Sequence, residues 1–328
     1  SFARDIMSPE EFNHLSEHVV PVLTDARPYG RYSMVDIDER GGVQVIVKAL
    51  MEAGLVNGDV PSCTGETLAE QIERLGAGAP DGTVVYPVDA PFKDTGGLRV
   101  LGGNLSPDHG AVLKLAGVEG GLEDDRFVGR ARIFDGERSL LETLEAAPDT
   151  FENHDMVIVR YEGPSGAPGM PEMLDSTSRI TTLCRERGIV VGLMTDARFS
   201  GGSVGLVIGH VGPEAALGGP IAFVEDGDEI VVDLGTNEIN CTALSDPDTL
   251  ARRRAVWERA VENNGGIHPL CGEVDTRLLN RMRLSAVSAV QGAGMHPDRL
   301  LWVSEPREAS RSGFVPGNVH RPGSGRAF

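Results

Sequence analysis

The chain contains few aromatic residues and few cysteines. Aromatics make up 5% of its 328 residues, and the four cysteines lie far apart, at positions 63, 184, 241 and 271. None forms a CxxC pair, so we expect reduced thiols, as in a cytoplasmic protein, rather than a disulfide framework. His268 and Cys271 have a spacing loosely suited to metal ligands, but a zinc site needs three or four ligands.

Basic charge and long apolar runs are also lacking. The chain has 49 Asp and Glu against 30 Lys and Arg, a formal net charge of −19. A chain this acidic repels phosphate backbones, so we expect no general binding to nucleic acid. No run of about 18 apolar residues occurs, which predicts no membrane span. The first eleven residues lack the basic-then-apolar layout of a signal peptide.

The composition that is present is that of a folded protein rich in turns. Apolar residues make up 40% and charged residues 24%, which excludes wholesale disorder. The first 90 residues indicate helices and loops. A capping box at Ser8 predicts one helix, an apolar face after Gly42 predicts a second that ends at Gly54, and a capping box at Thr67 predicts a third. Residues 77–94, rich in Gly, Pro and Asp, have the composition of a linker.

From about Gly96 the pattern changes to short apolar runs between Gly and Pro. These runs predict strands at residues 99–101, 156–161, 189–194, 221–224 and 229–234. An Asp-Gly turn at 226–227 suggests a hairpin between the last two. Helices are expected at 248–263 and 276–292, and residues 304–328 as a surface tail. Many short strands with Gly-rich turns are typical of a barrel or sandwich.

Two loops are the candidates for chemistry, because the common nucleotide-binding, zinc-protease and nucleophile-elbow motifs do not occur. Residues 160–174 follow one expected strand and contain a Gly- and Pro-rich stretch that ends at Glu172. Residues 195–205 follow another and contain Ser200. The competing interpretations are a surface loop with a solvated Glu172 and a turn in which Asp196 pairs with Arg198. His210 is more simply a structural residue.

These loops resemble those of the dihydroxy-acid dehydratase family, which includes sugar-acid and phosphogluconate dehydratases. The matching segments are residues 97–108, 160–174, 195–202, 209–216 and 225–228, with weaker similarity over 10–71. The dihydroxy-acid branch fits better than the sugar-acid branch, because residues 198–202 read Arg-Phe-Ser-Gly-Gly.

The resemblance implies an α+β fold: the end of an N-terminal α/β domain followed by a C-terminal β-barrel-like domain with flanking helices. Residues 1–94 would be the end of the first domain plus a linker. Residues 95–303 would form the barrel domain, and 304–328 a flexible tail. Family members are homodimers or tetramers built from dimers, and the active site lies between the two domains.

The implied reaction removes water from a 2,3-dihydroxy acid to give a 2-keto acid, a step in branched-chain amino acid biosynthesis. By resemblance, Ser200 is the base that takes the C2 proton, and Glu172 is a ligand of Mg²⁺. Arg198, Gly201 and Ser178 would bind the substrate, a small 2,3-dihydroxy or sugar acid. An iron–sulfur cluster, 2Fe-2S or 4Fe-4S, would act as Lewis acid on the leaving hydroxyl. A dry site that neutralises charge suits this chemistry.

The chain departs from the family pattern in ways that affect function. The family's cluster-binding cysteines and its other metal ligands belong to an N-terminal part that does not occur in this sequence. We therefore expect a piece or subunit that is inactive alone and needs a complementary N-terminal part. Ala197 and Glu66 replace a family Gly and Lys, and a methyl group at 197 would be strained if the backbone φ were positive.

Two other functions stay open. One is a non-catalytic dehydratase-like domain that binds a small acid or a partner chain. The other is a serine hydrolase that uses Ser200 and His210, although no nucleophile elbow supports it.

Overall fold

The computed structural model describes residues 7–27, 30–115, 122–199, 205–272, 274 and 276–296. Within these residues the α-helices are α1 (Pro9–His18), α2 (Met34–Glu39), α3 (Val43–Glu52), α4 (Leu68–Arg74), α5 (Glu137–Ala146), α6 (Leu174–Arg187), α7 (Pro247–Asn263) and α8 (Arg277–Ser285). The strands are β1 (Leu98–Leu101), β2 (Ala111–Lys114), β3 (Arg126–Asp135), β4 (Asp155–Arg160), β5 (Val191–Thr195), β6 (Val207–Gly209), β7 (Glu229–Asp233) and β8 (Glu238–Cys241). No helix in this part of the chain is both long enough and apolar enough to cross a membrane.

The strands form one sheet in the order β1-β2-β6-β5-β4-β3-β7-β8. β3, β4, β5 and β6 are mutually parallel, and the pairs β1–β2, β2–β6, β3–β7 and β7–β8 are antiparallel. A parallel bridge joins Gly102, directly after β1, to Glu238 at the start of β8. The sheet therefore closes on itself, and the predicted α+β fold with a barrel-like domain is confirmed.

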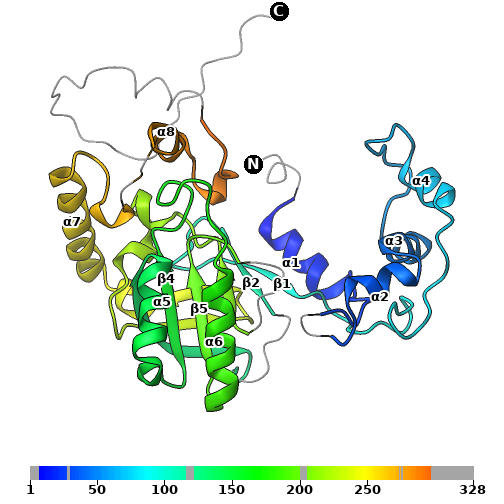
Figure 1. Ribbon diagram of the computed structural model, residues 1–328, viewed down its shortest axis with the longest axis horizontal. Helices are drawn as coiled ribbons and strands as arrows, with labels where there is room; N and C mark the ends of the chain where they lie inside the picture. Colours follow the sequence, from blue (N-terminus) through cyan, green and yellow to red (C-terminus); the bar gives the residue numbers. More distant parts are fainter. Residues whose placement is uncertain are drawn as a thin grey trace, which may run out of the picture.

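The parallel strands lie at the centre of the hydrophobic core. Every residue of β5, and every residue of β4 except Arg160, is buried, as expected where both faces of a parallel sheet are covered. One cluster fills the barrel and includes Leu113, Met156 and Ile208. A second includes Phe151 and Val159 and lies between the sheet and the helices α5 and α6, which run side by side over one face of the barrel (Figure 1).

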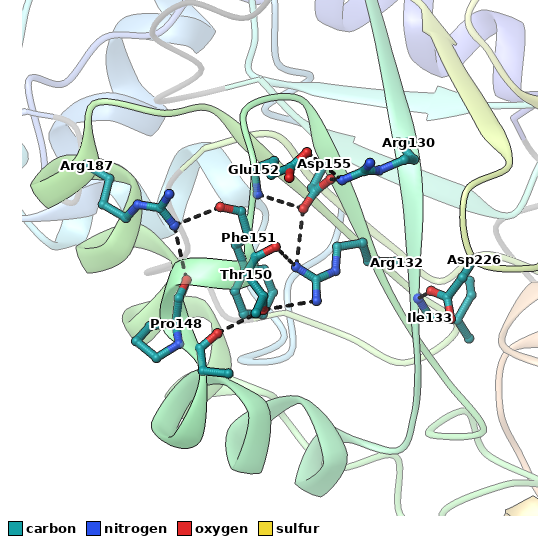
Figure 2. Close-up of polar contacts among 11 residues, drawn as sticks. Arg130, Arg132, Ile133, Pro148, Thr150, Phe151, Glu152, Asp155, Arg187 and Asp226 are labelled. Atoms are coloured by element: carbon teal, nitrogen blue, oxygen red, sulfur yellow. Dashed lines mark hydrogen bonds and ion pairs between the residues drawn. The ribbon is translucent and has the colours of Figure 1, made fainter.

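A network of charged and polar groups lies at the end of the barrel where β4 begins. Asp155, 1% exposed, forms ion pairs with Arg130 at 3.1 Å and Arg132 at 3.4 Å, and it accepts the Glu152 N–H at 2.8 Å. On the other side, Arg187 donates to the carbonyl of Phe151 at 2.7 Å. Figure 2 shows these groups converging on the turn before β4, so this end of the sheet is fixed by charge as well as by packing.

The first four helices differ in how they meet the barrel. α1 packs on β1, and the Asn13 side chain both donates to and accepts from the Val100 backbone at 2.8 Å. α2, α3 and α4 lie apart from the barrel in Figure 1. Their small cluster contains Ile37, Val45, Val84 and Val85. The expected linker at 77–94 therefore contributes two buried side chains to this unit.

Most element predictions in the N-terminal region are confirmed. α1 and α4 begin with the predicted capping boxes, and α3 begins after Gly42. Other predictions are wrong in detail. α7 is capped by Asp246 rather than beginning at 248, and α8 ends at Ser285 instead of 292.

The strand predicted at 221–224 is also wrong, and with it the hairpin at 226–227. Pro220–Phe223 is a 3₁₀ helix. Arg160 donates to the carbonyls of Ala222 at 2.8 Å and Val224 at 2.9 Å. Arg253 donates to that of Phe223 at 3.0 Å. These carbonyls are therefore satisfied by arginines and not by a neighbouring strand.

Candidate functional site

The two candidate loops leave the carboxyl ends of neighbouring parallel strands. One begins after Arg160 at the end of β4, and the other after Thr195 at the end of β5. The segment after β6 begins at His210, on the same edge of the sheet. Ligand sites in parallel sheets commonly lie outside this edge, because loops from adjacent strands meet there.

The described parts of the two loops come into contact. Glu172 and Arg198 form an isolated parallel β-bridge, and the Arg198 Nε donates to the Met170 carbonyl at 3.0 Å. Glu172 is exposed, and its carboxylate makes no hydrogen bond or ion pair with any other described residue. The structure thus places the predicted metal ligand beside the loop that leads to Ser200.

Two of the predicted site residues, Ser200 and Gly201, lie outside the described residues. Ser178 lies on α6, which follows the Glu172 loop. It is exposed, and its hydroxyl donates to the Leu174 carbonyl at 2.9 Å. Glu172 and Arg198 are therefore brought together by their backbones, whereas Ser178 lies further along the adjoining helix.

Asp196, which the sequence analysis considered only as a partner for Arg198, has a different role. It is 0% exposed, and its carboxylate accepts three backbone N–H groups. These come from Tyr161 at 3.0 Å, Glu162 at 3.1 Å and Ala215 at 3.0 Å. Burial raises the pKa of Asp196 to about 6, although these N–H groups oppose the rise. The pairing of Asp196 with Arg198 is not among the ion pairs of the described residues.

A second buried carboxyl group, Glu214, contacts the start of the Glu172 loop through Ser165. It is 1% exposed; its Oε2 accepts the Ser165 N–H at 3.0 Å, and its Oε1 has no hydrogen-bond partner within the described structure. Burial, reinforced by the negative charge of Asp196, raises the pKa of Glu214 to about 8. Gly163 is required here, since a Cβ at that position would lie 2.1 Å from Oε2.

The sequence analysis missed Asp196 and Glu214 as organising residues. For Asp196 the available signal was an acidic residue directly after a buried strand, whereas Glu214 lies five residues beyond the end of β6. Such a residue has few partners other than the backbone N–H groups of neighbouring loops.

His268 is held between aromatic rings. It stacks on Tyr161 with ring centroids 4.9 Å apart and on Trp257 at 5.6 Å. Its Nδ1 accepts the Leu270 N–H at 3.3 Å. These contacts support the structural interpretation of His268 over a metal ligand shared with Cys271.

The metal-binding capacity of the described residues is limited. They contain no group of three or more His, Cys, Asp or Glu side chains arranged to hold a metal ion. All four cysteines are described and free, and an iron–sulfur cluster needs three or four thiolates together. The cluster therefore does not fit these residues. Mg²⁺ fits in part, since Glu172 offers one carboxylate of the type that this ion prefers.

Two departures from the family pattern have simple structural outcomes. Ala197 is not among the residues with positive φ, so its methyl group packs without backbone strain in the cluster under α5 and α6. Glu66 forms a double hydrogen bond with Arg74, at 2.9 Å and 3.0 Å, beside α4.

Comparisons with known proteins match most of the chain to one protein family. Residues 83–293 match the family model described as "Dihydroxy-acid/6-phosphogluconate dehydratase C-terminal", and residues 3–71 match its N-terminal counterpart. The chain is 44% identical over 252 residues to a dihydroxy-acid dehydratase of Nocardioides sp., covering 76% of this chain and 42% of that protein. For a dihydroxy-acid dehydratase of Acidothermus cellulolyticus the identity is 45% over 249 residues, with the same coverage. For dihydroxy-acid dehydratase 2 of Corynebacterium efficiens it is 42% over 282 residues, covering 85% and 46%. The chain thus spans less than half the length of these relatives.

Proposed function

Since the chain belongs to the dihydroxy-acid/6-phosphogluconate dehydratase family, we propose that it is part of a hydro-lyase, comprising the end of the N-terminal domain and the barrel domain. The reaction removes water from a 2,3-dihydroxy acid and leaves a 2-keto acid. The observation that carries the proposal is the bridge between Glu172 and Arg198, because it joins the two loops from which the reacting groups would come.

In this proposal Ser200, as an alkoxide, takes the proton from C2. The electron pair of the C2–H bond forms the C2–C3 double bond, and the C3–O bond breaks. The departing hydroxide takes up the proton that Ser200 removed from C2, which gives water and restores the alkoxide, and the enol left behind tautomerises to the keto acid. Arg198 attracts the substrate carboxylate, and Gly201 allows the backbone to approach the substrate. Ser178 accepts a hydrogen bond from a substrate hydroxyl, because its own O–H donates to the Leu174 carbonyl.

Glu172 supplies one carboxylate oxygen for Mg²⁺, which when bound would neutralise negative charge on the substrate carboxylate and 2-hydroxyl. The other ligands, and the cysteines for an iron–sulfur cluster, would come from a complementary N-terminal part. We therefore propose a cytoplasmic chain that is inactive alone and works either as a homodimer or with such a part as its partner.

The test mixes the chain with the cluster-binding N-terminal half of a relative and measures 2-keto acid formation from a 2,3-dihydroxy acid. We expect turnover in the mixture and none from either part. Glu172→Gln should raise the Mg²⁺ concentration needed for half-maximal rate at least tenfold, because a neutral amide is a poorer ligand. Asp175→Asn, an exposed acid three residues along, serves as the control and should leave that requirement unchanged. Binding of the acid by the mixture without turnover would instead support a non-catalytic domain.

A further inference from the structure

Three segments meet at one buried carboxylate. Asp196 directly follows β5, and its Oδ2 accepts the N–H groups of both Tyr161 and Ala215, while its Oδ1 accepts that of Glu162. Tyr161 and Glu162 begin the segment after β4, and Ala215 lies five residues beyond His210 in the segment after β6. One side chain thus connects the carboxyl ends of three parallel strands.

The segments held by Asp196 are those that lead to the candidate catalytic groups. The β4 segment continues from Glu162 to Glu172, and the β5 segment continues from Asp196 itself to Ser200. Tyr161 has a φ of 68°, a conformation that non-glycine residues seldom adopt. Such a conformation persists when surrounding contacts enforce it, and the hydrogen bond from the Tyr161 N–H to Asp196 is one such contact.

We propose that Asp196 is a positioning residue, which fixes the described segments after β4, β5 and β6 relative to one another without touching the substrate. A carboxylate is required because all three partners are donors, and its two oxygens can accept all of them. An asparagine has one acceptor oxygen, so its amide hydrogens would point at a backbone N–H. The consequence for catalysis rests on the proposed function, whereas the consequence for the loops does not.

The experiment compares Asp196→Asn with Asp155→Asn. Asp155 is the matched control, since it is equally buried and also accepts a backbone N–H, but it lies at the other end of β4. Both variants are studied by hydrogen–deuterium exchange at urea concentrations that give them the same free energy of unfolding. We expect Asp196→Asn to speed exchange in residues 161–172 and 210–216 at least tenfold, and Asp155→Asn to leave those segments within threefold of the wild type. Equal acceleration in both variants would overturn the proposal.

A measurement on the wild-type chain covers the case in which Asp196→Asn does not fold. The amide protons of Tyr161, Glu162 and Ala215 are followed by NMR between pH 4.5 and 7.5. Because one carboxylate accepts all three, their shifts should move together with one midpoint. Among the described residues, three titratable groups interact electrostatically with Asp196: the carboxyls of Glu162 and Glu214 and the thiol of Cys271. Three unrelated midpoints would contradict the assignment.

The reconstituted enzyme provides the functional readout. We expect Asp196→Asn to lower kcat about 100-fold with KM changed less than threefold, because misplacement by about 1 Å costs this much in rate. At matched stability Asp155→Asn should keep the wild-type kcat. If the wild-type mixture forms no product, the proposed function fails, and the exchange experiment still decides the role of Asp196. A kcat for Asp196→Asn equal to that of Asp155→Asn would refute the positioning role.

Discussion

Glu214→Gln should change how the stability of the barrel depends on pH. The pKa of Glu214 is raised to about 8 in the folded chain, first by burial and then by the charge of Asp196, from an ordinary value of 4.5. The protonated form is therefore the stable one at neutral pH. Its contribution to stability is complete below pH 4.5 and is lost as the pH rises through about 8, because the folded state then has to release a proton that the unfolded state has already lost.

The size of the effect follows from the raised pKa. Between pH 7 and pH 9, a group with a folded-state pKa of about 8 holds on average about half a proton in the folded chain, whereas in the unfolded chain it holds almost none. Integrated over those two units, at about 1.4 kcal/mol per proton and pH unit, the wild type loses about 1.4 kcal/mol. A glutamine has the shape of the protonated carboxyl, can still accept the Ser165 N–H, and does not titrate.

The assay is urea unfolding of both proteins at pH 7, 8 and 9. The difference in unfolding free energy between Glu214→Gln and the wild type should shift by about 1.4 kcal/mol in favour of the variant across this range. Cys271, whose pKa burial raises to about 11, is present in both proteins and cancels in the difference. Parallel curves, with a constant difference within about 0.3 kcal/mol, would show that Glu214 is already ionised at pH 7 and would refute the reasoning.

Three further outcomes are expected. Asp155→Ala should lower the unfolding free energy by about 1–3 kcal/mol, since Arg132 and the Glu152 N–H lose a buried acceptor while the half-exposed Arg130 keeps Glu152; a loss below about 0.5 kcal/mol in urea unfolding would count against the network in Figure 2. Gly163→Ala should cost about 1–3 kcal/mol because its Cβ meets Glu214, whereas Gly78→Ala, with no atom within 4 Å, should be neutral; equal thermal stability of the two variants would be the contrary result. Limited proteolysis should cleave the exposed stretch at residues 77–82 before it cleaves the barrel, and simultaneous cleavage of both regions would contradict this order.

The fold was predictable from the sequence where a pattern had one local cause. The capping boxes at Ser8 and Thr67 mark helix starts because their hydrogen bonds lie within four residues. The apolar runs of β4 and β5 were recognisable because a parallel strand covered on both faces needs apolar residues throughout.

Prediction failed where tertiary contacts replace local preference. The helix α6 was not predicted because it is rich in serine and threonine. These side chains compete for backbone hydrogen bonds and so lower the helix propensity of the segment; they are Ser176, Thr177, Ser178, Thr181 and Thr182. Several of them instead donate to the carbonyl one turn earlier, as Thr181 does to Thr177 at 2.8 Å. Similarly, α8 is followed directly by a bridge between Ala286 and Met295, a contact that the local sequence does not predict.

The candidate site was predictable only in part, for a similar reason. The family resemblance named Glu172 and Arg198, and their backbone bridge is consistent with neighbouring roles. The same resemblance named Ser200 and Gly201, which lie outside the described residues. It did not identify Asp196 or Glu214, because their partners are backbone N–H groups brought close by the fold and not by sequence.

The proposed chemistry depends most directly on the Ser200 hydroxyl. The deciding measurement is 2-keto acid formation by the chain assembled with a cluster-binding N-terminal half, using substrate with hydrogen or deuterium at C2. Three forms are compared: wild type, Ser200→Ala, and Ser203→Ala as the matched serine control. We expect turnover by the wild type and by Ser203→Ala, with slower reaction of the deuterated substrate, and a loss of at least 1,000-fold in Ser200→Ala. Wild-type rates in Ser200→Ala would contradict the account.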